Sequence, residues 1–491
     1  MLTVFFPKRV YWITTGVLLL LFCSTLIHRI AHFDDAWCTE QSYWLLKDGV
    51  VRSELFRGYN YWHERLYVFH KAFVYIQAAI LHFVGFSIWG ARATPLLFSA
   101  VTLLLLLVCF RNQREHQWLA AILYVGCGTL WLFGVDNRPE TMVATCGFGS
   151  FLLLRRANLT TRDIVLAGLL AGLAGLTHLN GIIYVAAGSL WLWTRRGWLK
   201  AFAFGLVGGA TLSLYLLDAV LDGRLDRLLY QFQHDHVTQN NLHWWSKLQV
   251  MAEYHRLFMH SEGETPLTIL FLSILAVLLL VERLAWRAFF TPTLHYLLLL
   301  IGLFWLLTKS STAYYFILFV PFIITVIVEL TLSFFPQMSK KARLCLIVVF
   351  CLYPVGSVLR AYYLIRENQT YPNVAVENAR LAAYMPRQGA KTIAPIDFFF
   401  GQMDNYRIRG LTYYSLLNSN QYQDQLTVPA FFAMAAQDSV MYIVSDHRTW
   451  NQAYHIPPNA PARIGAYQRV FQDQWHSIYT YRSPVLASSQ E

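Results

Sequence analysis

The sequence predicts an all-α polytopic membrane protein of about eleven transmembrane helices, with interfacial helices on its outer face and a small C-terminal soluble α/β domain. Three observations lead to this fold class: a series of long apolar runs, basic clusters in alternate loops, and a polar tail without a spanning run. Of the 491 residues, 56% are hydrophobic and 14% are charged. Soluble domains usually carry about 25% charged residues, so much of this surface must face something other than water.

The net charge of +11 suits either nucleic acid or an anionic membrane. Nucleic-acid binding needs a basic stripe on a soluble face. Here the basic residues form short clusters between apolar runs, so we expect a lipid bilayer as the partner and no nucleic acid. The seven cysteines include no CxxC pair, and all but Cys38 lie in apolar segments. This pattern indicates neither a disulfide framework nor a zinc site, and no metal or cofactor is expected.

A spanning helix needs about 20 mostly apolar residues. Apolar runs of this kind occupy residues 10–28, 90–110, 118–135, 140–154, 164–178, 181–194, 199–220, 266–282, 292–308, 313–334 and 343–362. The first run is too long for a signal peptide, and no clear cleavage site follows it. We therefore expect it to be retained as the first helix.

The Lys and Arg content of the loops predicts the orientation of the helices. The basic loops contain Arg111 and Arg114; Arg155, Arg156 and Arg162; Arg195, Arg196 and Lys200; Arg283 and Arg287; and Lys340, Lys341 and Arg343. Together with the N-terminal Lys8 and Arg9, these loops mark the cytoplasmic side. The opposite loops, which are expected outside, are residues 29–65, 136–139, 178–180, 221–265 and 309–312.

Residues 66–87 look like a further span, but counting them as one would break the alternation of basic loops. The run also carries His70, Lys71 and further polar side chains. We therefore expect a helix that lies in the outer interface, and a true span is the alternative. Residues 29–89 then form a first outer loop with interfacial helices.

The composition changes after residue 366. Residues 370–491 are rich in Asn, Gln, Asp and Tyr, and short β-type runs at 391–395 and 439–444 flank a helical stretch at 428–437. The sequence thus predicts a transmembrane domain over residues 1–366 and an extracytoplasmic α/β domain over residues 367–491.

Acidic residues of the membrane part gather on the predicted outer side, at the edges of apolar runs. They are Asp34, Asp35, Glu40, Asp136 and Glu140. A charge at mid-bilayer costs about 2.5–3.5 kcal/mol even on a lenient scale, so these acids must face water, one another or cations. The cations expected on the same side are Arg65, Lys71, Arg138 and Lys309.

Asp34 and Asp35 are neighbours, so their side chains point in different directions on any regular backbone. We expect separate roles, in which one acid is a general base and the other holds a loop. The alternative is that both are solvated residues that cap the following helix.

Lys309 precedes three hydroxyl residues and then Tyr314 and Tyr315. A lysine with short donors at a helix end suits a phosphate, whereas snorkelling to the headgroups is the alternative. Arg138 stands in a similar position, since Pro139 fits the first turn of the next helix.

The order of these features resembles the GT-C glycosyltransferases, and most of all the group of protein O-mannosyltransferases and lipid A aminoarabinose transferases. The order is one span, an outer acidic pair, an interfacial helix ending in VGFSIWGAR, two spans, an Arg-Pro-Glu turn and later YYFILFVP. The resemblance covers roughly residues 10–330. It rests on order and topology, because no single short motif in it is diagnostic.

The resemblance implies a sugar donor carried on undecaprenyl or dolichyl phosphate, and an inverting, metal-independent transfer. The family's catalytic acid falls on Asp34, and its second-loop acid falls on Glu140. Asp35 departs mildly from the Asp-Glu pair that is common in the family. The stretch HERLYVFHKAF lacks the family's prolines, so the choice among its cations stays open. The residues expected around the donor phosphate are Arg65, His70, Lys71, Arg138, Lys309, Tyr314 and Tyr315.

The predicted function is the transfer of a sugar from a polyprenyl-phosphate carrier to an acceptor hydroxyl on the extracytoplasmic side of a bacterial inner membrane. A carboxylate would serve as the base and cations would stabilise the leaving phosphate. The acceptor is a lipid, a glycan or a protein. A transporter or flippase of polyprenyl-linked lipid or polysaccharide is the first alternative, although transporters usually place polar groups at the membrane midplane. A non-catalytic membrane scaffold is the second.

Overall fold

The computed structural model describes residues 8–27, 29–235, 244–308, 312–448 and 453–482. Lys309 therefore lies outside the described residues. The chain divides into two compact units. The first unit consists of Met1–Arg29, Phe69–Phe73 and Ala93–Thr370, and the second of Ile30–Val68, Val74–Arg92 and Tyr371–Glu491.

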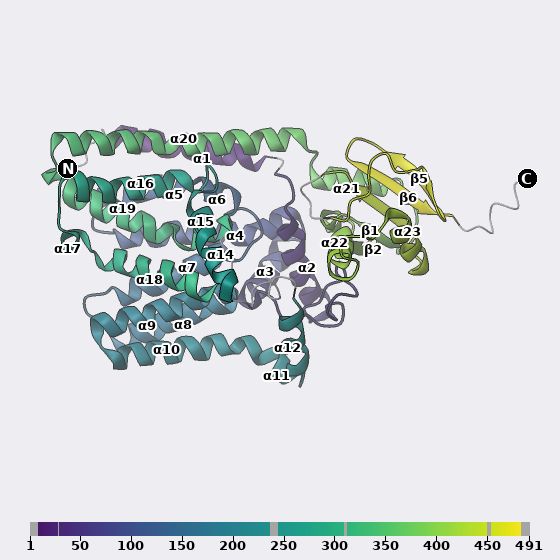
Figure 1. Cartoon of the computed structure of the whole chain (residues 1–491), viewed down its shortest axis with the longest axis horizontal. Coiled ribbons are helices and arrows are strands. Elements are labelled where there is room, and N and C mark those ends of the chain that lie inside the picture. The colour runs from purple at the N-terminus through teal and green to yellow at the C-terminus, as the bar shows by residue number, and fades with distance from the viewer. Residues whose placement is uncertain (1–7, 28, 236–243, 309–311, 449–452, 483–491) are drawn as a thin grey trace, which may run out of the picture. The chain divides into compact units, whose positions relative to one another are not determined.

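The first unit is a bundle of helices (Figure 1). Its longer helices are α1 (Lys8–Leu26), α4 (Ile88–Cys109), α5 (Arg114–Val125), α7 (Glu140–Leu154), α8 (Thr161–Thr177), α9 (Ile182–Arg196), α10 (Trp198–Ser213), α16 (Thr265–Ala276), α18 (Pro292–Leu307), α19 (Val320–Phe334) and α20 (Lys340–Thr370). Shorter pieces are α6 (Gly128–Leu132), η2 (Leu179–Gly181), η3 (Leu214–Leu216), α11 (Leu217–Leu221), α12 (Leu225–His234), α14 (Trp244–Glu253), α15 (His255–Met259), η4 (Val277–Val281), α17 (Trp286–Phe289), η5 (Ala313–Leu318) and η6 (Phe335–Gln337).

Each predicted apolar run is helical over most of its length. Among the described residues, five helical stretches are long and apolar enough on their own to cross a bilayer: Arg9–Leu26, Ile88–Cys109, Trp198–Leu221, Val320–Gln337 and Lys340–Ala382. Other runs are shorter, and some are interrupted, as between α5 and α6. The number of about eleven spans therefore stays a prediction. Residues 66–87 form α3 (Lys71–Val84), which at about 1.5 Å per residue is some 21 Å long.

Close packing holds the bundle together. Helix α8 packs against α7, α9 and α10, while α20 packs against α1 and α16, and these helices run side by side in Figure 1. Gly172 on α8 faces the backbone of α10, where a Cβ atom would come within 2.5 Å of the Gly208 carbonyl oxygen. Small residues that let backbones approach are typical of helix contacts in lipid.

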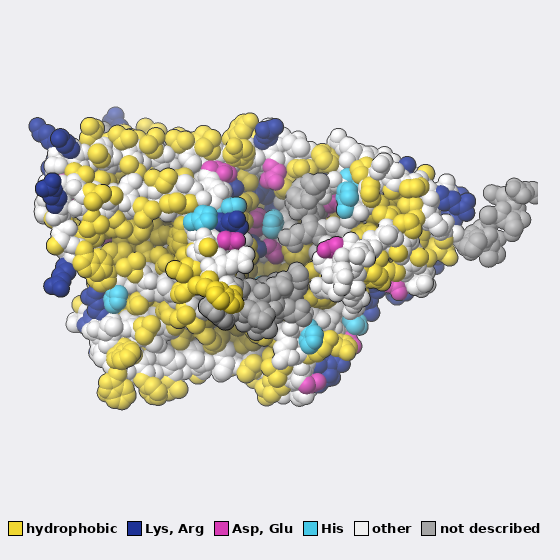
Figure 2. All heavy atoms as spheres, in the orientation of Figure 1, with side chains coloured by type: hydrophobic (Ala, Val, Ile, Leu, Met, Phe, Trp, Pro, Cys, Tyr) yellow, Lys and Arg dark blue, Asp and Glu magenta, His cyan; other side chains and the backbone are white. Residues whose placement is uncertain are grey.

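The surface of the bundle agrees with a membrane setting. In the view of Figure 2, hydrophobic side chains cover much of its flank, and Lys and Arg side chains gather at the left-hand end, where α1 begins. Basic residues at one end of an apolar bundle are expected where helices emerge on the cytoplasmic side.

The C-terminal part of the second unit contains a six-stranded sheet in the order β2-β1-β3-β6-β5-β4. Its strands are β1 (Lys391–Ala394), β2 (Arg407–Gly410), β3 (Tyr442–Asp446), β4 (Arg463–Ile464), β5 (Tyr467–Gln472) and β6 (His476–Tyr481). Strands β2, β1 and β3 are parallel, whereas β6, β5 and β4 continue the sheet in antiparallel fashion.

Helices α21 (Val374–Ala382), α22 (Leu411–Gln421) and α23 (Val428–Gln437) accompany the sheet. Its core includes Ile393 and Ile443 from the central strands and Phe431 from α23, all fully buried. The predicted runs at 391–395 and 439–444 appear as β1 and β3, and the predicted helix appears as α23. The antiparallel strands were not predicted.

The segment predicted to form the first outer loop belongs to the same unit as the sheet. It contains α2 (Phe33–Asp48), from which the Tyr43 hydroxyl donates to Asp404 at 2.5 Å. The Gly410 amide, at the end of β2, donates to the Leu55 carbonyl at 2.8 Å. Residues of the outer loop and of the C-terminal segment thus complete each other's hydrogen bonds and fold as one unit.

Candidate active site

Asp35 is locked in the start of α2. Its side chain is 0% exposed, and the Arg92 guanidinium donates to both of its oxygens, at 3.2 and 2.5 Å. The His32 backbone amide donates to the same carboxylate at 2.7 Å, as in a capping box. A buried acid with a paired cation and a capping bond has a structural role, because losing either partner would leave an uncompensated charge.

Asp34 differs from its neighbour. Its side chain is 17% exposed, and one carboxylate oxygen lies 3.4 Å from His32 Nδ1. The two acids point in different directions, and it is Asp34 that reaches the surface of the unit. Between these two, Asp34 has the environment of a proton acceptor.

Glu40 is the third acid of this segment and is fully buried in α2. It accepts hydrogen bonds from the Ser53 hydroxyl at 2.6 Å, from Trp44 Nε1 at 3.0 Å, and from the Glu54 and Leu55 amides at 2.6 and 3.0 Å. Burial raises the pKa of Glu40 to about 7, although these donors pull the pKa downward. Glu40 therefore organises the turn at residues 53–55.

The first unit brings Arg138, Glu140 and Tyr314 together. Arg138 Nε and Nη2 donate to the two oxygens of Glu140 at 3.2 and 2.9 Å. The guanidinium carbon lies 3.6 Å from the centre of the Tyr314 ring. Glu140 is the first residue of α7, and its side chain is almost completely buried. This fork-shaped pairing and the stacking both require an arginine rather than a lysine.

An aromatic series continues from Tyr314. Its ring centre is 4.4 Å from that of Tyr315, which meets His178 edge to face at 5.7 Å. His178 in turn stacks on His70 at 4.7 Å. The Asn180 amide donates to His178 Nδ1 at 3.0 Å, so a neutral imidazole carries its proton on Nε2, which lies 3.5 Å from the Tyr315 hydroxyl. Sequence reasoning missed His178, although it stands at the outer end of a predicted span.

Lys71 is the first residue of α3 and is only 5% exposed. Its ammonium lies 2.5 Å from Asp218 Oδ1, and the rings of Phe69 and Tyr215 have their centres 4.5 and 4.8 Å away. A lysine buried among rings needs a counterion, and Asp218 supplies it. Sequence reasoning missed Asp218, although an acid inside the run at 199–220 was a sign of a partner.

The remaining predicted cations, Arg65 and Lys309, lie outside the described part of the first unit. Arg65 belongs to the second unit, where its guanidinium carbon lies 5.7 Å from the Tyr67 ring centre. Lys309 lies outside the described residues. In the described part of the first unit, the predicted residues that the structure connects are His70, Arg138, Glu140, Tyr314 and Tyr315, with Lys71 next to His70 in the chain.

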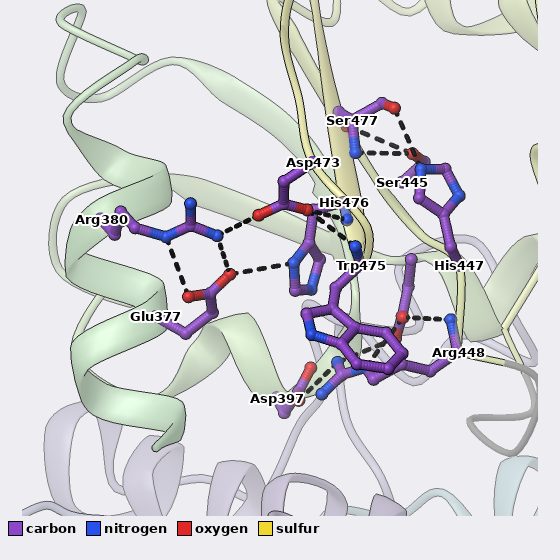
Figure 3. Close-up of polar contacts among 11 residues, drawn as sticks. Glu377, Arg380, Asp397, Ser445, His447, Arg448, Asp473, Trp475, His476 and Ser477 are labelled. Atoms are coloured by element: carbon purple, nitrogen blue, oxygen red, sulfur yellow. Dashed lines mark hydrogen bonds and ion pairs between the residues drawn. The ribbon is translucent and has the colours of Figure 1, made fainter. Parts of the chain in front are cut away.

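One group of metal-ligating side chains occurs among the described residues, and it lies in the C-terminal part of the second unit. Glu377, Asp473 and His476 place ligand atoms within 4.8 Å of one another. Figure 3 shows that the Arg380 guanidinium bridges both carboxylates and that His476 contacts Glu377. Because the Arg380 guanidinium already contacts both carboxylates and His476 contacts Glu377, the group is a structural ion-pair network.

No model of a known protein family matches the sequence, and a search of curated proteins finds no match. Solved structures do resemble the chain. ArnT from Cupriavidus metallidurans bound to undecaprenyl phosphate superposes with a TM-score of 0.64, at 12% identity over 98% of this chain and 99% of that chain. The apo state of ArnT superposes with a TM-score of 0.63, at 12% identity over 96% and 98% of the two chains.

The oligosaccharyltransferase AglB from Archaeoglobus fulgidus is also similar. Its complex with an inhibitory peptide and a dolichol-phosphate superposes with a TM-score of 0.51, at 13% identity over 89% of this chain and 70% of that chain. ArnT and AglB are both glycosyltransferases of the GT-C fold. The chain therefore has the GT-C fold of these membrane proteins, and the resemblance seen in the sequence is confirmed.

Proposed function

We propose that the protein is a membrane glycosyltransferase that moves a sugar from a polyprenyl-phosphate carrier to an acceptor hydroxyl on the extracytoplasmic side of a bacterial inner membrane. The observation that carries this proposal is the buried Lys71 at the first turn of α3, within a GT-C fold. The similar structures of ArnT and AglB hold undecaprenyl phosphate and a dolichol-phosphate, which are ligands of the same class.

Lys71 is assigned to the donor phosphate. Its ammonium and the positive end of the α3 dipole both attract an anion. Asp218 balances the lysine until the phosphate arrives and keeps the long side chain in place. The lipid carrier gains about 0.8 kcal/mol for each buried CH₂ group, so the phosphate has to be met at headgroup height.

Arg138 is assigned to the charge that develops on the leaving phosphate. Glu140 and Tyr314 fix the plane of its guanidinium, and a preorganised cation needs no rearrangement when the bond breaks. Glu140 and the two tyrosines are positioning residues in this scheme, and His70 and His178 extend the same group. Arg65 and Lys309 remain further candidates for phosphate contact.

Asp34 is assigned as the general base. It accepts the proton of the acceptor hydroxyl while the acceptor oxygen forms a bond to the anomeric carbon. The bond from that carbon to the phosphate oxygen breaks, and the polyprenyl phosphate leaves with the electron pair. Attack from the face opposite to the leaving group inverts the anomeric centre. The acceptor is a lipid, a glycan or a protein.

The test is sugar release from a radiolabelled polyprenyl-phosphate sugar by the purified protein in detergent. Asp34→Asn is expected to lower turnover by about 10²–10⁴-fold without changing the melting temperature. The matched control is Asp48→Asn, an exposed acid on the same helix, which should retain activity. Full turnover in Asp34→Asn would remove the base from this position.

A further inference from the structure

A polar cavity lies at the C-terminal end of α7, whereas Glu140 stands at its N-terminal end. Its volume is about 390 Å³, and its lining includes Arg111, His116, Arg155 and Glu329. Helix α7 has 15 residues, so its two ends are about 22 Å apart. The cavity is therefore separate from the residues assigned to the transfer reaction, and its basic lining belongs to loops predicted to be cytoplasmic.

Glu329 is the unusual member of this lining, because it is a carboxylate inside the apolar helix α19. Its Oε1 atom accepts from Arg155 Nη2 at 2.9 Å and from the Thr293 hydroxyl at 3.1 Å. Its Oε2 atom is buried, and no donor from the described residues reaches it. A buried carboxylate oxygen without a donor carries a desolvation cost, and ionisable groups at membrane depth usually mark a ligand or ion site.

The other side of the lining is basic. Arg111 is exposed in the turn between α4 and α5, and no ion pair joins it to any described residue. His116 is half-buried near the start of α5. Arg155 is matched by Glu329, and its side chain is 31% exposed. The cavity thus offers basic groups and one carboxylate, a pattern complementary to a ligand with one negative and one positive group.

We propose that this cavity binds the headgroup of a phospholipid that carries a primary amine, as in phosphatidylethanolamine. The ammonium pairs with the Glu329 carboxylate, and Arg111 and His116 hold the phosphodiester. Val108 and Phe110 also line the cavity and suit the apolar part of a lipid. A choline headgroup keeps the positive charge but has no N–H to donate, and a glycerol headgroup has no cation for Glu329.

The experiment measures lipid binding to the purified full-length protein by native mass spectrometry, with dioleoyl lipids that differ only in their headgroups. Because the choline lipid cannot form the hydrogen bonds to the charged Glu329 carboxylate, the ethanolamine lipid should bind at least about tenfold more tightly than the choline lipid. Glu329→Gln should remove this preference. Glu282→Gln should preserve it, because Glu282 is a partly exposed glutamate at the end of the predicted run 266–282 and does not line the cavity.

Arg111→Gln provides a second arm, because Arg111 is exposed and its replacement should not disturb folding. This variant should bind both lipids more weakly and keep the preference between them. Equal binding of the ethanolamine and choline lipids by the unaltered protein would overturn the proposal, and so would a preference that survives Glu329→Gln. Equally tight binding of acyl-free glycerophosphoethanolamine would assign the cavity to a soluble ligand instead of a lipid.

Discussion

Helix α7 has an arginine–glutamate pair at each end, and the two pairs differ in how completely they are closed. At the start of the helix, Arg138 contacts both oxygens of Glu140 and stacks on Tyr314. At the end, Arg155 contacts one oxygen of Glu329, and the other oxygen has no donor among the described residues. The same two residue types therefore form two different pairs. In the closed pair both glutamate oxygens accept from the arginine, and in the open pair only one glutamate oxygen does.

Breaking the closed pair should have the largest effect on stability. Glu140→Ala leaves Arg138 buried without its counterion, which typically costs about 3–5 kcal/mol. Glu329→Ala should cost less, because the side chain of Arg155 is more exposed to solvent. Thermal unfolding of both variants in the same detergent measures the difference. An equal loss of stability in Glu140→Ala and Glu329→Ala would show that the exposure of the arginine does not determine how much each pair stabilises the protein.

Replacing each arginine by lysine should separate geometry from charge. Arg138→Lys keeps the positive charge but loses the two-point contact with Glu140 and much of the stacking on Tyr314. Turnover should fall about 10–100-fold, equivalent to about 1.4–2.7 kcal/mol. Arg155→Lys should leave turnover unchanged in the same radiolabel assay. Unchanged turnover in Arg138→Lys would mean that the plane of the guanidinium is unimportant.

The aromatic side of the closed pair should contribute less. Tyr314→Leu removes the ring under Arg138, at an expected cost of about 1 kcal/mol in stability. Tyr314→Phe keeps the ring and is the matched control, so it should resemble the unaltered protein in thermal unfolding. If Tyr314→Phe lost as much stability as Tyr314→Leu, the phenolic hydroxyl would be the important group.

The Glu377–Arg380 pair of the C-terminal domain extends the comparison to a pair whose glutamate is buried and whose arginine is 42% exposed. Contacts with His476 and Arg380 lower the pKa of Glu377 to about 2, against the effect of burial. A lowered pKa in the folded state means that Glu377 stabilises the domain above about pH 4.3, its unfolded value. This stabilisation is lost as the pH falls from there towards 2.

The change with pH is expected to be the smallest of these effects, because solvent screens a partly exposed pair. Glu377→Gln should flatten the fall in melting temperature between pH 4.5 and pH 2.5, measured by circular dichroism of the full chain. Asp424→Asn, an exposed acid of the same domain, should leave the fall unchanged. An unaltered slope in Glu377→Gln would assign the acid sensitivity to other groups.

The sequence predicted the helices well because apolar length is a local property. Every apolar run became helical over most of its length, and the strands at 391–395 and 439–444 also appeared. Strands β5 and β6 escaped prediction because polar and aromatic side chains interrupt their apolar pattern, as in Tyr467–Gln472. These strands are stabilised by long-range pairing, of β5 with β6 and of β6 with β3, which a local sequence pattern does not show.

The candidate site was only partly predictable. Arg138 and Glu140 were identified from their positions at a helix end, and Tyr314 from the family resemblance. The three side chains do lie together. Asp218 and Glu329, which pair with Lys71 and Arg155, were missed. An acid inside an apolar run indicates that a cation lies nearby, but the sequence does not identify that cation. Lys71 and Asp218 are 147 residues apart in the chain, and only the packing of the helices between them brings them into contact.

The contact between Tyr43 and Asp404 has a consequence for how the protein is made. The two residues are 361 positions apart, and a ribosome adds about 5–20 residues per second. The segment around Tyr43 is therefore synthesised roughly 20–70 s before its partner exists, and the helices from α3 to α20 are synthesised in the meantime. During this interval Tyr43 and the Leu55 carbonyl lack their partners and are accessible to the chaperones and proteases that act on nascent chains. The second unit therefore cannot be complete until synthesis is nearly over.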